Sequence, residues 1–172
     1  MEHMFVEAHV ALPTSLAEAR SALSQSLHSR ELDTHSTDAY ADGLDVLLRV
    51  GPRGSASGLS KEVRVHLLDE RQSGHTYVYP LRWEATGTSG RLFPTLDANL
   101  GLTPSGDDST VLSIVGRYEP PLGGLGRRLD DAVLTRVADA TVRSMLRRFA
   151  IMVVAIADAR RCGATLASSV RG

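Results

Sequence analysis

The sequence is poor in cysteine, lysine and aromatic residues, and these scarcities exclude whole classes of protein. The single cysteine, Cys162, excludes an intramolecular disulfide and a zinc site built from several cysteines. We therefore expect a reducing, cytoplasmic environment. Lys61 is the only lysine among 19 basic residues, so the other 18 are arginines. Because these arginines are spread among acidic residues and the net charge is -1, no nucleic-acid partner is expected.

Long hydrophobic runs and metal-binding patterns are also lacking. The longest apolar run, residues 149–157, is well short of the ~20 residues that a membrane span needs. The first four residues have neither the basic nor the apolar part of a secretory signal, so we expect no export. None of the six histidines has the spacing of a metal site: His3, His9, His28, His35, His66 and His75. No metal or cofactor is expected.

The size and patterning of the chain predict one α+β domain over residues 1–172. A chain of 172 residues with 42% hydrophobic residues is enough for one well-buried core. Alternation of apolar and polar residues predicts strands, and the short turns between most of them favour an antiparallel meander. Pro80 cannot donate to a sheet ladder, so it predicts an edge or a bulge. The predicted strands lie near residues 6–12, 44–50, 63–67, 77–83, 96–102 and 110–116.

Three segments between the strands carry local signals. Ser15 and Glu18 have the spacing of a capping box, which predicts a helix with an apolar stripe up to Leu27. Residues 28–42 are polar and poorly patterned, so we expect an irregular crossing with at most a short helical turn. The Gly/Ser-rich loop 51–58 is predicted to be flexible and to gate one mouth of a cavity.

The most informative stretch is residues 116–131, in which a strand is followed by a Pro-Pro corner, a glycine-rich swivel and one long amphipathic helix. We expect these glycines to turn the helix back across the sheet. A phosphate loop is disfavoured because its lysine is missing. The helix is predicted from near Leu125 to about Arg160. Its inner stripe would be Leu134, Val137, Ala138, Thr141, Val142, Met145, Phe149, Met152 and Ile156, with Arg136, Asp139, Arg143 and Arg147 opposite.

The order of elements resembles the START-like superfamily, also called the Bet v 1-like or polyketide cyclase/dehydrase and lipid transport group. Three segments support this resemblance over nearly the whole chain: residues 81–85, residues 92–94, and residues 117–123 leading into Leu129. The resemblance implies a helix-grip fold, in which a curved antiparallel sheet wraps around a long C-terminal helix. It also implies an apolar ligand in the cavity under that helix. Fold alone does not fix function.

Nine residues on the predicted inward faces are candidates for ligand binding. The tyrosines and the tryptophan would each offer one polar atom in an apolar wall. No histidine, aspartate or glutamate faces inward in this register, which argues against general acid–base catalysis. The same residues also suit a plain core, and a register shift would bring Arg82, Asp97, Asn99 and Arg117 inside instead. The nine are Tyr77, Tyr79, Leu81, Trp83, Leu100, Leu112, Ile114, Met145 and Phe149.

We therefore expect binding of a small apolar or aromatic molecule between the sheet and the C-terminal helix. Two other functions stay open. One is an aromatase/cyclase-like enzyme, which an inward carboxylate, histidine or arginine would favour. The other is a protein-interaction module with a collapsed cavity, which an exposed apolar patch would favour. The long helix also allows contact with a second copy of the chain, as in a homodimer.

Overall fold

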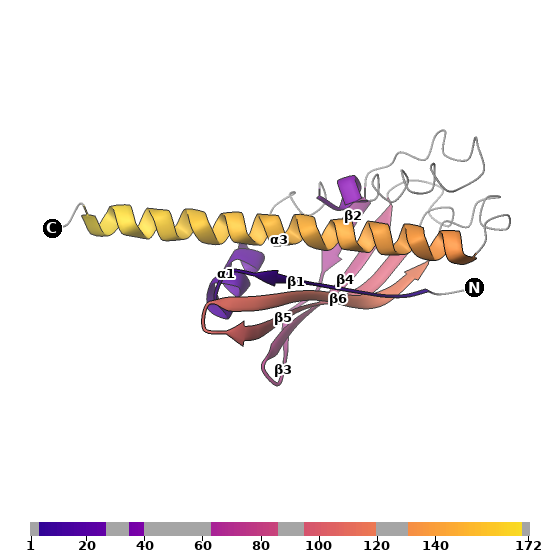
Figure 1. Cartoon of the computed structure of the whole chain (residues 1–172), viewed down its shortest axis with the longest axis horizontal. Coiled ribbons are helices and arrows are strands. Elements are labelled where there is room, and N and C mark those ends of the chain that lie inside the picture. Colours follow the sequence, from indigo (N-terminus) through magenta and orange to yellow (C-terminus); the bar gives the residue numbers. More distant parts are fainter. Residues whose placement is uncertain (1–3, 27–34, 40–62, 86–94, 120–130, 170–172) are drawn as a thin grey trace.

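The computed structural model describes residues 4–26, 35–39, 63–85, 95–119 and 131–169. These residues form one antiparallel sheet with a long helix across it (Figure 1). The strands are β1 (Met4–Leu12), β2 (Val63–Leu67), β3 (Arg71–Ser73), β4 (Thr76–Ala85), β5 (Thr95–Gly106) and β6 (Ser109–Glu119). The helices are α1 (Leu16–Ser26) and α3 (Asp131–Ser169), with a single helical turn at residues 35–39.

The strand order explains how the two ends of the chain come together. The order is β1-β6-β5-β4-β2, and β3 pairs with β4 beside β2. The predicted meander of β4, β5 and β6 is confirmed, and β1 returns to pair with β6. Because β1 and α3 both lie at that side of the sheet, the first strand packs directly against the last helix. The predicted strand 44–50 and the loop 51–58 lie outside the described residues.

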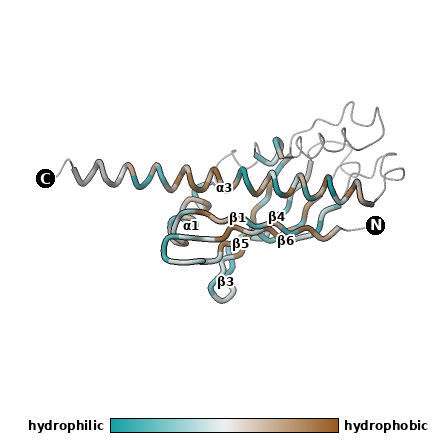
Figure 2. The backbone as a smooth tube through the Cα atoms, viewed as in Figure 1, coloured by the Kyte–Doolittle hydropathy of each residue, from teal (hydrophilic) through white to brown (hydrophobic). Residues whose placement is uncertain are grey.

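The predicted faces of the described strands are confirmed by their burial. On β5, Leu96, Ala98 and Leu100 are buried, whereas Asp97 and Asn99 are exposed. β1 and β6 alternate in the same way. The buried apolar residues of these strands form one cluster with residues of α3, which covers the sheet. Figure 2 shows hydrophobic positions along the strands and on α3. The four polar residues that a register shift would have brought inside, Arg82, Asp97, Asn99 and Arg117, are exposed on the outer face.

Pro80 lies at a break in the ladder, as predicted. β2 pairs with β4 up to Leu67 and Leu81, and β3 resumes with Arg71 opposite Val78. Residues 68–70 therefore stand opposite only two residues of β4, Tyr79 and Pro80. The N–H of Leu68 donates to the carbonyl of Pro80 at 2.8 Å. Proline has no N–H for a ladder, so the neighbouring chain bulges here. The short strand β3 was missed by the sequence prediction because its three residues are all exposed.

Gly116 allows β5 and β6 to approach each other unusually closely. It stands opposite Ala98. A Cβ at position 116 would overlap the Cβ and Cα of Ala98 and the carbonyl oxygen of Asp97. Glycine inside a strand is typical of a sharp bend or of close backbone contact. We infer that this pair sets the curvature with which the sheet wraps around α3.

Helix α1 begins with the predicted capping box. The Ser15 Oγ accepts from the Glu18 N–H at 3.4 Å, and Glu18 Oε2 accepts from the Ser15 N–H at 3.2 Å. The helix buries Ala19, Ala22 and Leu23. It packs against the second half of α3, where the Arg160 guanidinium donates to Gln25 of α1 at 2.7 Å.

Helix α3 is longer than the sequence prediction. Its predicted start near Leu125 lies outside the described residues, but the predicted end near Arg160 is wrong, since the helix continues to Ser169. Gly163 does not adopt the positive φ that commonly ends a helix. The predicted inner stripe is confirmed, with Ile156 half-buried. Its C-terminal turns extend past the sheet (Figure 1).

Replacing Gly116 by alanine should destabilise the protein more than the same change at Gly101. At Gly116 the new Cβ meets backbone, which has to move, at a cost of about 1–3 kcal/mol. At Gly101 it meets the Ser113 Oγ at 2.7 Å, and that side chain can turn away. Chemical denaturation of both variants measures the difference. Equal losses would mean that Gly116 has no special role in the bend.

Phe149 should anchor α3 on the sheet. It is fully buried, whereas Ile151 on the same helix is 69% exposed. We expect Phe149→Ala to lower the free energy of unfolding by about 3–5 kcal/mol. The control, Ile151→Ala, should cost less than about 0.5 kcal/mol, as surface changes usually do. Denaturant titrations of the two variants test this, and a small loss for Phe149→Ala would contradict the packing.

Candidate functional site

The nine predicted wall residues lie together on the concave face and on the side of α3 that covers it. Eight of them belong to the main buried cluster, and the ninth, Tyr77, is half-buried at its edge. Seven of the eight are completely or almost completely shielded by the sheet and the helix, with exposures of 0–1%: Tyr79, Trp83, Leu100, Leu112, Ile114, Met145 and Phe149. Their burial fits both a packed core and a closed ligand wall, so their role in binding stays a prediction.

Cross-strand register arranges these residues in rows. Leu102 stands between Leu112 of β6 and Tyr77 of β4, and Leu100 stands between Ile114 and Tyr79. In another row Leu96 separates Trp83 from Tyr118. The two rings lie 6.2 Å apart between centroids with an interplanar angle of 29°. This stacked pair forms the flat, aromatic end of the face.

Two threonines on the inner side are satisfied by the chain itself. The Thr110 hydroxyl donates to the carbonyl of Thr14 at 2.9 Å, and the Thr141 hydroxyl donates to the carbonyl of Val137 at 2.9 Å. Both residues are buried. Their hydroxyl protons are therefore engaged in holding the strand end and the helix, so they contribute little polarity to a ligand wall.

Tyr79 is the centre of the polar network at this face. Its hydroxyl donates to Glu70 Oε2, and the hydroxyl of Ser24 on α1 also bonds to it. The Arg20 guanidinium, from α1, holds the same carboxylate through Nε at 2.9 Å and through NH2 at 2.6 Å. Arg20 also lies over the ring of Tyr77, 4.3 Å from its centroid. The network joins α1, the 68–70 bulge and β4.

The network fixes the protonation of its members. Hydrogen bonds from Arg20, and then from Tyr79, hold the pKa of Glu70 below its ordinary value, although burial opposes this shift. Burial, followed by the bond to Glu70, raises the pKa of Tyr79. The hydrogen bond to Glu70 is also the main reason why the pKa of Arg20 is raised. At neutral pH the site therefore holds a carboxylate, a neutral phenol and a guanidinium.

Glu70 is the functional candidate that the sequence analysis missed. The prediction that no acidic residue or histidine occupies an inward strand position holds for the described strands. Glu70 is not on a strand, however, but in the bulge opposite Pro80, which lets it reach the hydroxyl of Tyr79. The only sequence signal for it was Pro80 itself. Arg20 was equally hidden, because it is an exposed residue of α1 with no local partner.

Other sequence candidates do not form a site in the described residues. No three residues among their histidines, cysteines, aspartates and glutamates lie close enough to hold a metal ion. Cys162 is exposed on α3. In the same residues no helix is long and apolar enough to cross a membrane. The glycine-rich segment before α3 lies outside the described residues.

Comparison with known proteins was informative only at the level of structure. No family model and no curated protein matches the sequence. A conserved protein from Geobacillus kaustophilus is 14% identical with a TM-score of 0.51, covering 87% of this chain and 95% of the other. The Zhui aromatase/cyclase from Streptomyces sp. R1128 is 11% identical with a TM-score of 0.46, covering 92% and 96%. The lipid transfer and protein localization domain of human StarD13 is 12% identical with a TM-score of 0.36, covering 84% and 76%.

The fold predicted from the sequence is therefore confirmed. The chain has a helix-grip fold, with a curved antiparallel sheet and a long C-terminal helix across it. Identities of this size establish the fold alone, because proteins of one fold have many functions.

The Glu70 network should make stability depend on pH in the acid range. Since the pKa of Glu70 is lower in the folded state, its contribution is present above its ordinary value of 4.5 and is lost as the pH falls through the folded pKa. Glu70→Gln should cost roughly 1 kcal/mol at pH 7, because Arg20 is partly exposed to solvent. The difference from the wild type should shrink as the pH falls below 4.5 toward the lower, folded-state pKa.

Denaturant titrations at several pH values measure this effect. The control is Asp69→Asn, which changes the neighbouring exposed carboxylate in the same bulge. It should leave the pH profile close to that of the wild type. A difference between the wild type and Glu70→Gln that does not shrink at any acid pH at which both proteins stay folded would contradict the assigned ion pair.

Proposed function

We propose that the protein binds a small apolar or aromatic molecule between the concave face of the sheet and α3. The observation that carries this proposal is the make-up of the shared surface. The sheet contributes aromatic and aliphatic side chains, and α3 contributes Met145 and Phe149 opposite them. Ligand sites in proteins commonly have such apolar walls with few polar groups. Met145 is flexible and adapts to irregular shapes, so we expect loose selectivity.

The polar groups of this wall disfavour a charged ligand. On the inward positions of the described strands the chain has no arginine, lysine or histidine, and the nearest guanidinium, Arg20, is already held by Glu70. Burying a phosphate without a partner is costly. The stacked rings of Trp83 and Tyr118 instead suit a flat aromatic group. A cytoplasmic location is part of this proposal, as expected from the single cysteine.

An aromatase/cyclase-like enzyme is the second proposal, and Glu70 is the observation that favours it. Its carboxylate reaches the buried hydroxyl of Tyr79, so a polar group does adjoin the inner face. A raised pKa keeps that phenol as a proton donor. We rank the enzyme second because the Tyr79 hydroxyl already donates its hydrogen bond to Glu70, whose carboxylate Arg20 also holds. Loss of turnover, with binding retained, in Tyr79→Phe would favour the enzyme.

A protein-interaction module is the third proposal, supported by the outer face. Phe5 and Leu68 are large apolar residues that are 69% and 58% exposed. Both line one hollow of about 550 Å³ on the outer side of the sheet, together with Pro80 and Val115. Exposed apolar surface of this kind often marks an interface, including that of a homodimer. A filled interior together with partner binding at this hollow would favour the module.

An uncharged apolar probe should bind and reduce the fluorescence of Trp83. Trp83 is the only tryptophan and lies in the proposed wall, so its emission reports on the interior. We expect N-phenyl-1-naphthylamine to bind saturably and to accept energy from Trp83, and naphthalene should displace it. Adenosine triphosphate should not compete, because its charges would be buried without partners. Fluorescence titration measures both effects.

A matched pair of variants separates interior binding from surface binding. Met145→Ala enlarges the space beside the proposed wall and should change the affinity for the probe, whereas Arg136→Ala, at an exposed position of the same helix, should not. Thermal unfolding first confirms that both variants are folded at the titration temperature. Absence of saturable binding, or equal effects of the two substitutions, would contradict an interior site and favour the interaction module.

A further inference from the structure

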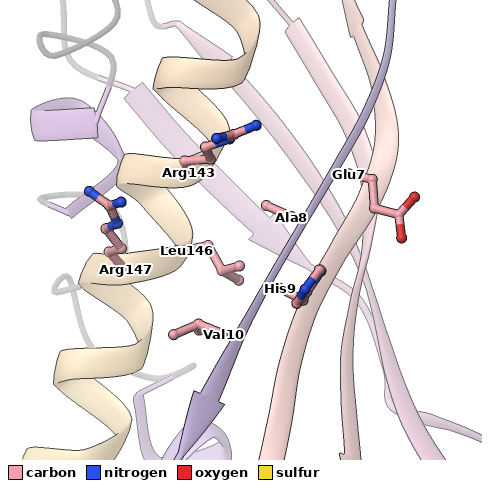
Figure 3. Close-up of a pocket in the computed structure, with 7 residues that line it drawn as sticks. All are labelled: Glu7, Ala8, His9, Val10, Arg143, Leu146 and Arg147. Carbon is pink, nitrogen blue, oxygen red and sulfur yellow. The ribbon is translucent and has the colours of Figure 1, made fainter.

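A surface groove runs along the seam between β1 and α3, outside the interior face discussed above. Both elements run in the same direction along this seam (Figure 1). The first half of the groove is a hollow of about 440 Å³ whose floor is formed by Ala8, Val10 and Leu146. Figure 3 shows these three side chains between the strand and the helix. β1 is the edge of the described sheet, so no described strand covers the groove.

The first half of the groove is basic. Arg143 and Arg147 both project from α3 and line the hollow, Arg143 toward β1 and Arg147 away from it in this view (Figure 3). Glu7 and His9 of β1 also line the hollow, but both lie on the outer side of the strand and point away from α3 (Figure 3). Two arginines four residues apart lie on one side of a helix and repel each other. An anion between them would remove that repulsion and receive charge-assisted hydrogen bonds.

Little in the described structure neutralises this pair. The Oδ2 atom of Asp139 is 3.8 Å from the Nη2 atom of Arg143, and both side chains are exposed. Arg147 has no ion-pair partner among the described residues. Exposed pairs such as that of Arg143 with Asp139 are weak. The two guanidinium groups are therefore available to a ligand.

The second half of the groove is apolar. A further hollow of about 420 Å³ continues along the same two elements, one helical turn later on α3. Its walls are Ala11 and Leu12 of β1, and Ala150, Ile151, Val154 and Ala155 of α3, with Asp158 at the far end. The Asp158 carboxylate forms an ion pair with Arg161. The seam thus has a cationic end and an apolar end.

We infer that this seam binds a single-chain anionic amphiphile, with its carboxylate or phosphate between Arg143 and Arg147 and its hydrocarbon tail along the apolar hollow. The charge of the first hollow matches the head, and the apolar second hollow matches the tail. Neither hollow alone would bind a ligand tightly. Exposed arginines bind anions weakly, and a shallow apolar hollow binds a hydrocarbon chain weakly. The inference is independent of the proposed interior site.

Decanoate, at concentrations where it stays monomeric, is the probe that tests this inference. Decanol has the same chain without the charge, and acetate has the charge without the chain. Isothermal titration calorimetry should show decanoate binding at least about tenfold more tightly than either. This binding should persist when N-phenyl-1-naphthylamine is present at saturation. Equal affinity for decanoate and decanol would overturn the inference, because the arginines would then contribute nothing.

Surface substitutions locate the site. Arg143→Gln with Arg147→Gln should raise the Kd of decanoate by about tenfold or more and leave that of decanol unchanged. Arg136→Gln removes another exposed arginine of α3 that does not line the groove, so it is the matched control. For the tail, Ala155→Glu should weaken decanoate, whereas Ala159→Glu, on an exposed residue that does not line the hollow, should not.

Two further outcomes would overturn the inference in favour of another occupant. Binding to anionic phosphatidylglycerol vesicles without binding to monomeric decanoate would mean that α3 recognises a membrane surface. Displacement of decanoate by a capped peptide of alternating aspartate and leucine, at lower concentration than decanoate itself requires, would mean that the seam accepts an extended acidic segment. An affinity for decanoate that is the same in the double arginine variant as in the wild type would also overturn it.

Discussion

Packing of α3 on the concave face is the interaction on which the rest of the structure depends. The sheet has one apolar face, and among the described elements only α3 is long enough to cover it. The cover works because the sheet bends, and Gly116 permits that bend by letting β5 and β6 approach where any side chain would overlap. Phe149 and Met145 are then buried between the helix and the sheet. Curvature and cover therefore require each other, since a flat sheet would contact the helix along only a narrow line.

The parts of the fold with a strong local period could be predicted from the sequence. Alternation of apolar and polar residues indicated which face of each described strand is buried, and the stripe of α3 indicated its inner side. The return of β1 to β6 was not predicted, because pairing between distant strands leaves no local period. The end of α3 was predicted too early for a related reason. Its last turns extend past the sheet, so burial no longer marks where the helix stops.

The candidate site divides in the same way. Its apolar members, such as Leu100 and Ile114, follow from the strand register and were predicted. Its polar network was not, because Arg20 and Glu70 are 50 residues apart and neither belongs to a periodic pattern. Pro80 links the two levels: the missing N–H interrupts the ladder, the neighbouring chain bulges, and the bulge carries Glu70 to Tyr79. A single residue thus converts a local constraint into a long-range contact between α1 and the sheet.

The geometry of α3 also explains how one helix can serve two separate surfaces. Successive residues of a helix are turned by about 100°, so positions two apart lie on nearly opposite sides. Met145 and Phe149 are buried against the sheet, whereas Arg143 and Arg147, two positions earlier, are exposed at the seam with β1. A substitution of either arginine therefore leaves the interior wall intact, and a change at Met145 leaves the charged seam intact. None of the nine predicted wall residues lines the seam, although Ala8, Leu12, Leu146 and Ala150 belong both to the buried cluster and to the lining of the seam. The charges of the seam can therefore change without altering the predicted wall.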